Sequence, residues 1–329
     1  MALACAARAR RPPRRHRLGG ALAVAVAIAV GAGCGNGDDE SAVGAIAPPG
    51  AGGTLVWALS EAPRDLDPLL STSPAGQLLS RQIYEPLTSR VETPYGEGRA
   101  ASGLAESHRR ANGAVWLLRL RHGVTFQDGS AFDAEAVIAN ARRWRTTSAG
   151  RRLLPDLAEV TAPRSYLVIF RLDQPDPRFD RVLASPRLGI VSPESLPSRS
   201  GRTSRLREPG TGGTGPFELR DRGAGRSLIA RNLDWWGSPR GFGPALDEVE
   251  FRVVPGDEER LRLLKTGTVQ VAEDLGPDQL ARARRDPLLT TAKVGGAGTA
   301  GLERSVRGIP RGIGPPSLSS VWLTRIGAD

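Results

Sequence analysis

The sequence predicts an α/β fold with a mixed sheet, because strand-like and helix-like segments alternate along its 329 residues. The side chains of residues 115–121 and 165–172 follow a pattern with a period of two residues, which is typical of strands. Ser73, Asp133 and Asp257 each stand at the start of a helix-like segment, where such side chains cap the first turn. We find no internal repeat.

The ordered part of the chain is expected to begin with a strand and a helix. TLVWAL, residues 54–59, is a candidate for a buried strand, and a turn-rich loop follows it. Ser73 caps and Pro74 opens a helix that runs to about Tyr84, with apolar residues at helical spacing.

A second unit consists of the strand at 115–121, a helix and the strand at 165–172. An Asp-Gly pair at residues 128–129 turns the chain after the first of these strands. Asp133 caps the helix, which carries an apolar stripe.

A third unit combines strands and helices from residue 217 onward. Its expected strands span residues 217–220, 227–231, 249–254 and 269–272, and its expected helices span 257–266 and 277–285. Past residue 294 the sequence is rich in Gly and Pro and is expected to form loops, with residues 319–326 as one further strand.

The first 34 residues have the layout of an export signal. Six arginines precede an apolar run at residues 18–30, which is too short to span a bilayer as a permanent anchor. The run ends in small residues before Cys34 and resembles a bacterial lipoprotein cleavage site, so residues 1–33 form the expected signal and Cys34 the lipidated residue. An ordinary secretory signal or a short anchor helix is the alternative. Residues 34–52 suit a flexible tether.

Charge and cysteine content exclude several classes of function. Six of the 45 Lys and Arg and none of the 35 Asp and Glu precede Cys34, which leaves a net charge of about +4 after cleavage. This small excess forms no basic face with interleaved aromatic residues, so nucleic acid is not an expected partner. Cys5 is removed with the signal, and the histidines that stay, His108 and His122, are too few for a histidine-rich site. We therefore predict no metal and no cofactor.

The stretch GTGGTGPFEL, from residue 210, matches the dinucleotide pattern G-x-G-x-x-G but lacks its context. No apolar strand precedes it, and two short extended segments joined by a turn follow it where a helix should begin. The chain also lacks the Gly-Lys-Ser/Thr ending of a Walker loop. We therefore expect these glycines to shape the backbone where the chain re-enters a sheet.

Eight stretches in fixed order resemble the extracellular solute-binding proteins of bacterial importers for oligopeptides, dipeptides and nickel complexes. The resemblance covers roughly residues 52–289. The stretches are GGTLVWALSEAPRDLDP, QIYEPL, SGLAESHRRANGAVWLLRLRHGVTFQDGSAFDAEAVIAN, VTAPRSYLVIFRLDQPDP, IVSPESLP, GTGPFEL, RNLDWWGSPRGFGPALDEVEFRVVP and LLKTGTVQVAEDL.

The resemblance implies a fold like that of type II periplasmic binding proteins, in which two lobes close on a ligand. Residues 53–290 would form the first lobe, with about 85–210 as an inserted smaller subdomain, and residues 291–329 a Gly/Pro-rich tail. The strand at 54–59 and the re-entry at Phe217 should share one sheet. The resemblance also implies that the second lobe is largely missing from this sequence.

The resemblance also places five residues of the first lobe at the ligand cleft: Ser71, Thr72, Ser73, Glu273 and Asp274. Hydroxyl groups can bond to the backbone of a peptide, and the two carboxylates can accept from an amine. The alternative for the acidic pair is a solvated loop. Trp235 and Trp236 are interpreted as packing rather than as a stacking platform.

The function that the resemblance implies is capture of a peptide or similar small solute for the permease subunits of an ABC importer. The protein would act at the outer face of the cytoplasmic membrane, anchored through Cys34. One alternative is a one-lobed remnant without transport activity. A secreted hydrolase is disfavoured, because the chain has no G-x-S-x-G stretch and neither retained histidine is placed to activate a serine.

Overall fold

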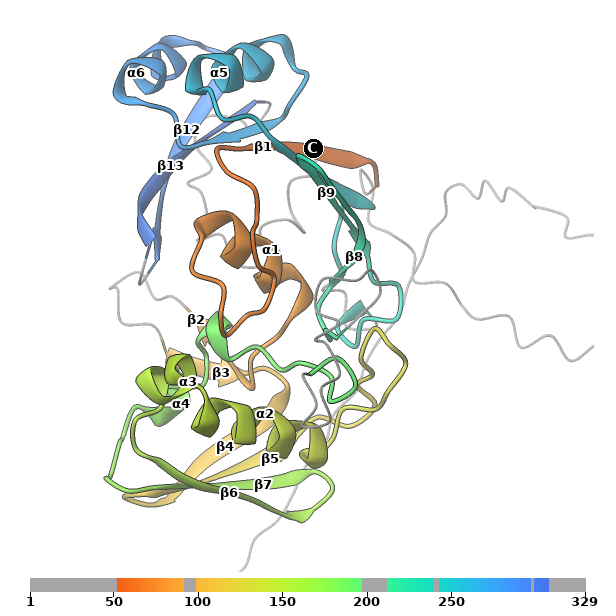
Figure 1. The fold of residues 1–329 in the computed structure, drawn as a ribbon, viewed down its shortest axis with the longest axis vertical. Coiled ribbons are helices and arrows are strands. Elements are labelled where there is room, and N and C mark those ends of the chain that lie inside the picture. Colours follow the sequence, from red (N-terminus) through yellow and green to blue (C-terminus); the bar gives the residue numbers. More distant parts are fainter. Residues whose placement is uncertain (1–51, 92–98, 197–211, 239–242, 297–298, 308–329) are drawn as a thin grey trace, which may run out of the picture. The chain divides into compact units, whose positions relative to one another are not determined.

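The computed structural model describes residues 52–91, 99–196, 212–238, 243–296 and 299–307. Its largest sheet has seven strands, in the order β12-β13-β11-β1-β10-β9-β8. Figure 1 labels β12, β13, β1, β9 and β8 of this sheet. The bounds of these strands are β1 Thr54–Leu59, β8 Phe217–Gly223, β9 Arg226–Arg231, β10 Glu248–Val253, β11 Val271–Glu273, β12 Leu289–Gly296 and β13 Thr299–Arg307. β1 pairs in parallel with both β10 and β11, whereas the other pairs are antiparallel, so the sheet is mixed as predicted.

A second sheet has four antiparallel strands, in the order β4-β5-β7-β6. These strands span β4 Ala105–Asn112, β5 Val115–Leu120, β6 Leu157–Arg164 and β7 Leu167–Leu172, and a separate pair consists of β2 Thr88–Val91 and β3 Arg99–Ser102. The helices are α1 Pro74–Ile83, α2 Ala134–Thr146, α3 Ser148–Leu153, α4 Phe179–Val182, the 3-10 helix Pro186–Leu188, α5 Asp257–Thr266 and α6 Pro277–Arg285.

Side-chain caps explain where two of the helices begin. The Ser73 hydroxyl accepts a hydrogen bond of 3.1 Å from the Gly76 N–H at the start of α1. Asp133 caps α2 by accepting from the N–H groups of Glu135 and Ala136. The cap predicted at Asp257 is wrong by one residue, because Gly256 is the N-cap of α5 and Asp257 is its first helical residue.

Both faces of β1 are buried, which suits a strand between two parallel neighbours. Leu55, Trp57 and Leu59 join a core cluster with α1 and with strands β8 to β10. Ala58 lies on the opposite face, in a cluster with the buried leucines of α5. A third cluster surrounds the four-stranded sheet and α2, and it contains Trp116, Trp144 and Phe170.

β1 and β8 lie in the same sheet, which confirms the expected re-entry at Phe217. The glycines before β8 allow this re-entry, because a Cβ at Gly213 or Gly215 would overlap backbone carbonyl oxygens at the end of α1. The N–H of Gly215 donates to Ile83 O at 2.8 Å. These glycines therefore let two backbone segments touch.

The chain past residue 294 differs from the prediction of loops. β13 pairs with both β11 and β12, so residues 299–307 continue the main sheet. The strand predicted at 319–326 lies outside the described residues. Within the part of the chain that the structure describes, no helix combines the length and the apolar character needed to span a membrane.

Candidate functional site

The parallel strands β1, β10 and β11 end side by side at one edge of the main sheet. Leu59 pairs with Val253, and Ala58 pairs with Ala272 one residue before Glu273. The N–H of Val254, the residue after β10, donates to Leu59 O at 2.8 Å, so β1 and β10 stay hydrogen-bonded up to the end of both strands. Loops at the carboxyl ends of parallel strands are a common place for ligand sites.

The three predicted residues before α1 differ in their access to solvent. Ser71 is 1% exposed, and its hydroxyl lies where a Cβ on residue 76 would stand, so Gly76 leaves room for it. Ser73 is half-buried and caps α1. Thr72 between them is exposed, and it alone of the three offers an open side chain.

The two predicted acidic residues also differ. Glu273 is 2% exposed at the end of β11, whereas the next residue, Asp274, is exposed. Asp274 has a φ of 55°, and it is the one non-glycine residue with positive φ in the described part of the chain. A side chain in this conformation is strained, and such strain concentrates at functional sites.

Arg260 of α5 holds the ends of β10 and β11 together. Its guanidinium donates to Glu273 O at 2.9 Å, to Val254 O at 2.6 Å and also to Asp274 O. The side chain is 2% exposed, and burial lowers the pKa of Arg260 from its ordinary value, opposed by the nearby carboxylates. The sequence analysis missed this residue, although its helical spacing with Leu264 puts both on the buried face of α5.

Different contacts therefore fix the two sets of predicted residues, the segment 71–73 before α1 and the acidic pair after β11. Ser71 donates its N–H to Asp67 O at 2.9 Å, and Ser73 belongs to the start of α1. Arg260 holds the backbone of Glu273 and Asp274.

The carboxylate of Glu85 is the centre of a polar network that the sequence analysis also missed. Trp236 Nε1 donates to it at 2.8 Å, Thr214 Oγ1 at 2.9 Å and Trp235 Nε1 at 3.3 Å. The Arg121 guanidinium lies 4.3 Å from the centre of the Trp236 ring. Burial raises the pKa of Glu85 from 4.5 to about 7, and the three hydrogen bonds and Arg121 oppose this rise. The two tryptophans thus pack around Glu85. The sequence signal that could have identified Glu85 is its position as a glutamate among the apolar residues of the stretch QIYEPL.

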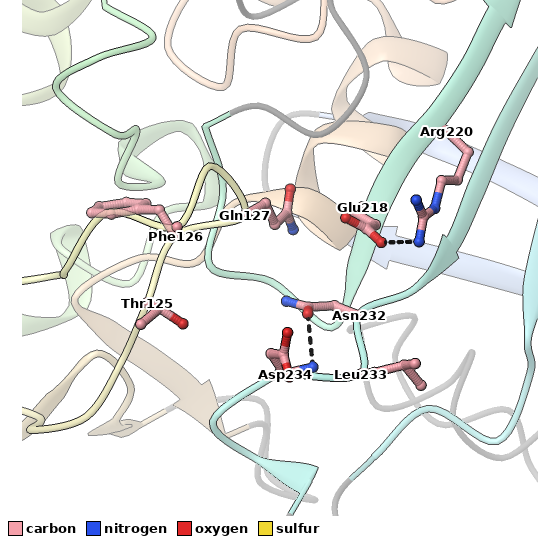
Figure 2. Close-up of a pocket in the computed structure, with 9 residues that line it drawn as sticks. Thr125, Phe126, Gln127, Glu218, Arg220, Asn232, Leu233 and Asp234 are labelled. Atoms are coloured by element: carbon pink, nitrogen blue, oxygen red, sulfur yellow. Dashed lines mark hydrogen bonds and ion pairs between the residues drawn. The ribbon is translucent and has the colours of Figure 1, made fainter.

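Two pockets are lined by none of the five predicted site residues. The larger, of about 510 Å³, lies between the loop at 125–129, β8 and the residues after β9 (Figure 2). In this larger pocket, Glu218 forms an ion pair with Arg220 at 2.5 Å, and Asn232 Oδ1 accepts a hydrogen bond from the Asp234 N–H at 3.1 Å. The smaller, of about 230 Å³, lies between the loop after β1 and the β8–β9 turn. Among the described residues, no group of three or more His, Cys, Asp or Glu could hold a metal ion.

Comparison with known proteins finds a matching family and several relatives. The family described as bacterial extracellular solute-binding proteins, family 5, matches over residues 100–306. The glutathione-binding protein GsiB of Escherichia coli strain K12 is 28% identical over 211 residues, which are 63% of this chain and 39% of the relative. GsiB of Salmonella paratyphi A is 27% identical over 220 residues, which are 66% of this chain and 41% of the relative.

Solved structures share the fold. The periplasmic binding protein DppA of Helicobacter pylori, in complex with the peptide STSA, has a TM-score of 0.64 at 21% identity and is matched over 74% of this chain and 51% of its own. NikA of Brucella suis, in complex with Fe(III)-EDTA, has a TM-score of 0.63 at 23% identity, over 74% and 48%. The chain thus spans about half the length of these structures and about two fifths of the sequence relatives.

Proposed function

The chain belongs to family 5 of the bacterial extracellular solute-binding proteins, and on this premise we propose that it captures a peptide or similar small solute for an ABC importer. Its fold is that of the type II periplasmic binding proteins. The relatives named above are binding proteins rather than enzymes.

The observation that carries the proposal is the exposed, positive-φ Asp274 at the carboxyl end of β11. A backbone in this conformation is kept only where its surroundings hold it, and Arg260 does so by donating to the carbonyl oxygens of Glu273 and Asp274. The Asp274 carboxylate would accept from an amine of the solute, and Thr72 would bond to its backbone. Ser71, Ser73 and Glu273 would support these two contacts from the interior.

Peptide titration tests this proposal. We expect heat on adding millimolar di- to pentapeptides to the chain, with dissociation constants weaker than about 100 micromolar, because the chain has about half the length of its structural relatives and supplies part of their contacts. Asp274→Asn should weaken binding further. Asp234→Asn, which changes an exposed carboxylate in the larger pocket, is the matched control.

Two outcomes would contradict this expectation. Equal binding by wild type and Asp274→Asn would remove Asp274 from the site. Low-micromolar binding that is lost on changing Glu273 and Asp274 to Ala would show that this half-length chain suffices for tight capture.

We further propose that residues 1–33 are a signal, that residues 34–52 are a tether and that Cys34 carries lipid at the outer face of the cytoplasmic membrane. The basic segment, the short apolar run and the small residues before Cys34 support this assignment. Cells fed a labelled fatty acid should label the wild type but not Cys34→Ala. Label on the variant, or none on the wild type, would refute the anchor.

A further inference from the structure

The smaller pocket is lined by arginine side chains from separate parts of the chain. Arg64 comes from the loop after β1, Arg222 from the end of β8 and Arg226 from the start of β9. Its lining, all of it within the described residues, includes no acidic side chain. A pocket of about 230 Å³ with this charge suits a small anionic group rather than a whole solute.

The pocket lies at the same sheet edge as Asp274. The N–H of Val253 donates to Gly225 O at 2.8 Å, which places the β8–β9 turn beside the end of β10. The row of strand ends therefore runs from the β8–β9 turn through β10 and β1 to β11. The pocket borders one end of this row, and Asp274 follows the strand at the other end.

The three arginines have different roles in the pocket. Arg222 donates to Arg64 O at 2.9 Å and also to Pro63 O, so it fixes the loop after β1 against the turn. Arg226 pairs with Asp221 at 2.9 Å, and its side chain is 49% exposed. Arg64 is exposed at the rim. A guanidinium group can bind a carboxylate through two parallel N–H groups, so Arg64 and Arg226 are suited to hold one between them.

We propose that this pocket is an anion subsite that takes the carboxylate end of the captured solute, while Asp274 takes its ammonium end. The inference rests on the proposed function and adds the solute's polarity and length. Three strand spacings separate β9 from β11, which is about 14 Å. An extended peptide covers about 3.5 Å per residue, so the separation suits about four residues.

Nuclear magnetic resonance on the ¹⁵N-labelled full chain tests the subsite, with tetra-alanine and its C-terminal amide as probes. We expect the free acid to shift the backbone resonances of Gly223 and Gly225 and to bind about threefold more tightly than the amide. Arg226→Gln and Arg64→Gln should each reduce this difference. Arg164→Gln, which changes an exposed arginine at the end of β6, should leave it unchanged.

Asp221→Asn should increase, rather than reduce, the difference in affinity between the free acid and the amide. It removes the charge that competes for Arg226, so the free acid should bind more tightly while the amide is unaffected. Added salt should weaken the free acid more than the amide.

The outcomes separate this inference from the proposed function. If the acid and the amide bind equally and shift Thr72 and Asp274 but neither Gly223 nor Gly225, the subsite is wrong and solute capture stands. If none of these resonances moves up to about 10 mM peptide, both proposals are overturned.

Discussion

Glu85 shows how one half-buried glutamate can join distant parts of the chain. Its partners are Thr214, before β8, and Trp235 and Trp236, after β9, so three segments meet at one side chain. The pKa of Glu85 is raised to about 7 because burial disfavours the charged form. The folded state therefore holds this proton more tightly than the unfolded state does, and the folded state loses stability as pH rises from about 4.5 to about 7.

We expect Glu85→Gln to reduce the fall in the free energy of unfolding between pH 5 and pH 8, by at most about 3 kcal/mol. Urea titrations of both proteins across this range measure the difference. The two proteins share every other titratable group, so the comparison isolates the contribution of Glu85. Equal pH dependence in the two proteins would show that Glu85 keeps one charge state across the range.

Among the elements, the segment before β8 depends on two glycines that touch the end of α1. Gly213 and Gly215 belong to the stretch that matches a dinucleotide motif, and the structure gives them a packing role instead. A Cβ at Gly213 would meet the backbone carbonyl group of Ile83 as well as its Cγ2, and a backbone group cannot move aside as the end of a flexible side chain can.

Gly213→Ala should therefore lower the free energy of unfolding by about 1–3 kcal/mol, because the backbone would have to shift. Gly223→Ala is the matched control, since a Cβ there meets nothing within 4 Å, and it should stay within about 0.5 kcal/mol of wild type. Chemical denaturation of both variants checks the prediction. A neutral Gly213→Ala would mean that α1 and the re-entry segment can separate without cost.

The sequence predicted elements whose signal is local and missed those that depend on distant partners. β5 and β7 alternate over six residues and were predicted from that period. β13 reads TAGLERSVR, without an apolar alternation, and it is a strand because β11 and β12 pair with it. For the same reason, only part of the candidate site could be predicted from the sequence. Asp274 could be named from a resemblance, but its positive φ and the contacts of Arg260 follow from packing between α5 and two strands.

At the scale of the whole molecule, β1 finds both of its neighbours late in the sequence. Thr54 pairs with Glu248, and Trp57 pairs with Val271, so the main sheet closes only when most of the chain is present. The four-stranded sheet, in contrast, is built from residues 105–172 and has a core of its own around Trp116 and Phe170.

We therefore propose that residues of about 85–210 form an inserted subdomain that folds independently. A fragment with these bounds should unfold cooperatively on heating, as followed by circular dichroism, because almost all of its core cluster lies within it. A fragment of residues 53–247, which lacks β10 and β11, should leave β1 without a partner. A gradual, non-cooperative melt of the first fragment would refute the subdomain.

β8 lies at one end of the seven-stranded sheet and pairs only with β9 among the described strands. Three charged residues follow one another on it, Arg220, Asp221 and Arg222, and its pairing with β9 is irregular between Leu219 and Asp221. An unpaired strand can act as a template for a strand of another chain, and charges and a bulge oppose such addition. At high local concentration, a second copy would meet mixed charge and a broken register along β8, so this edge resists growth into larger aggregates.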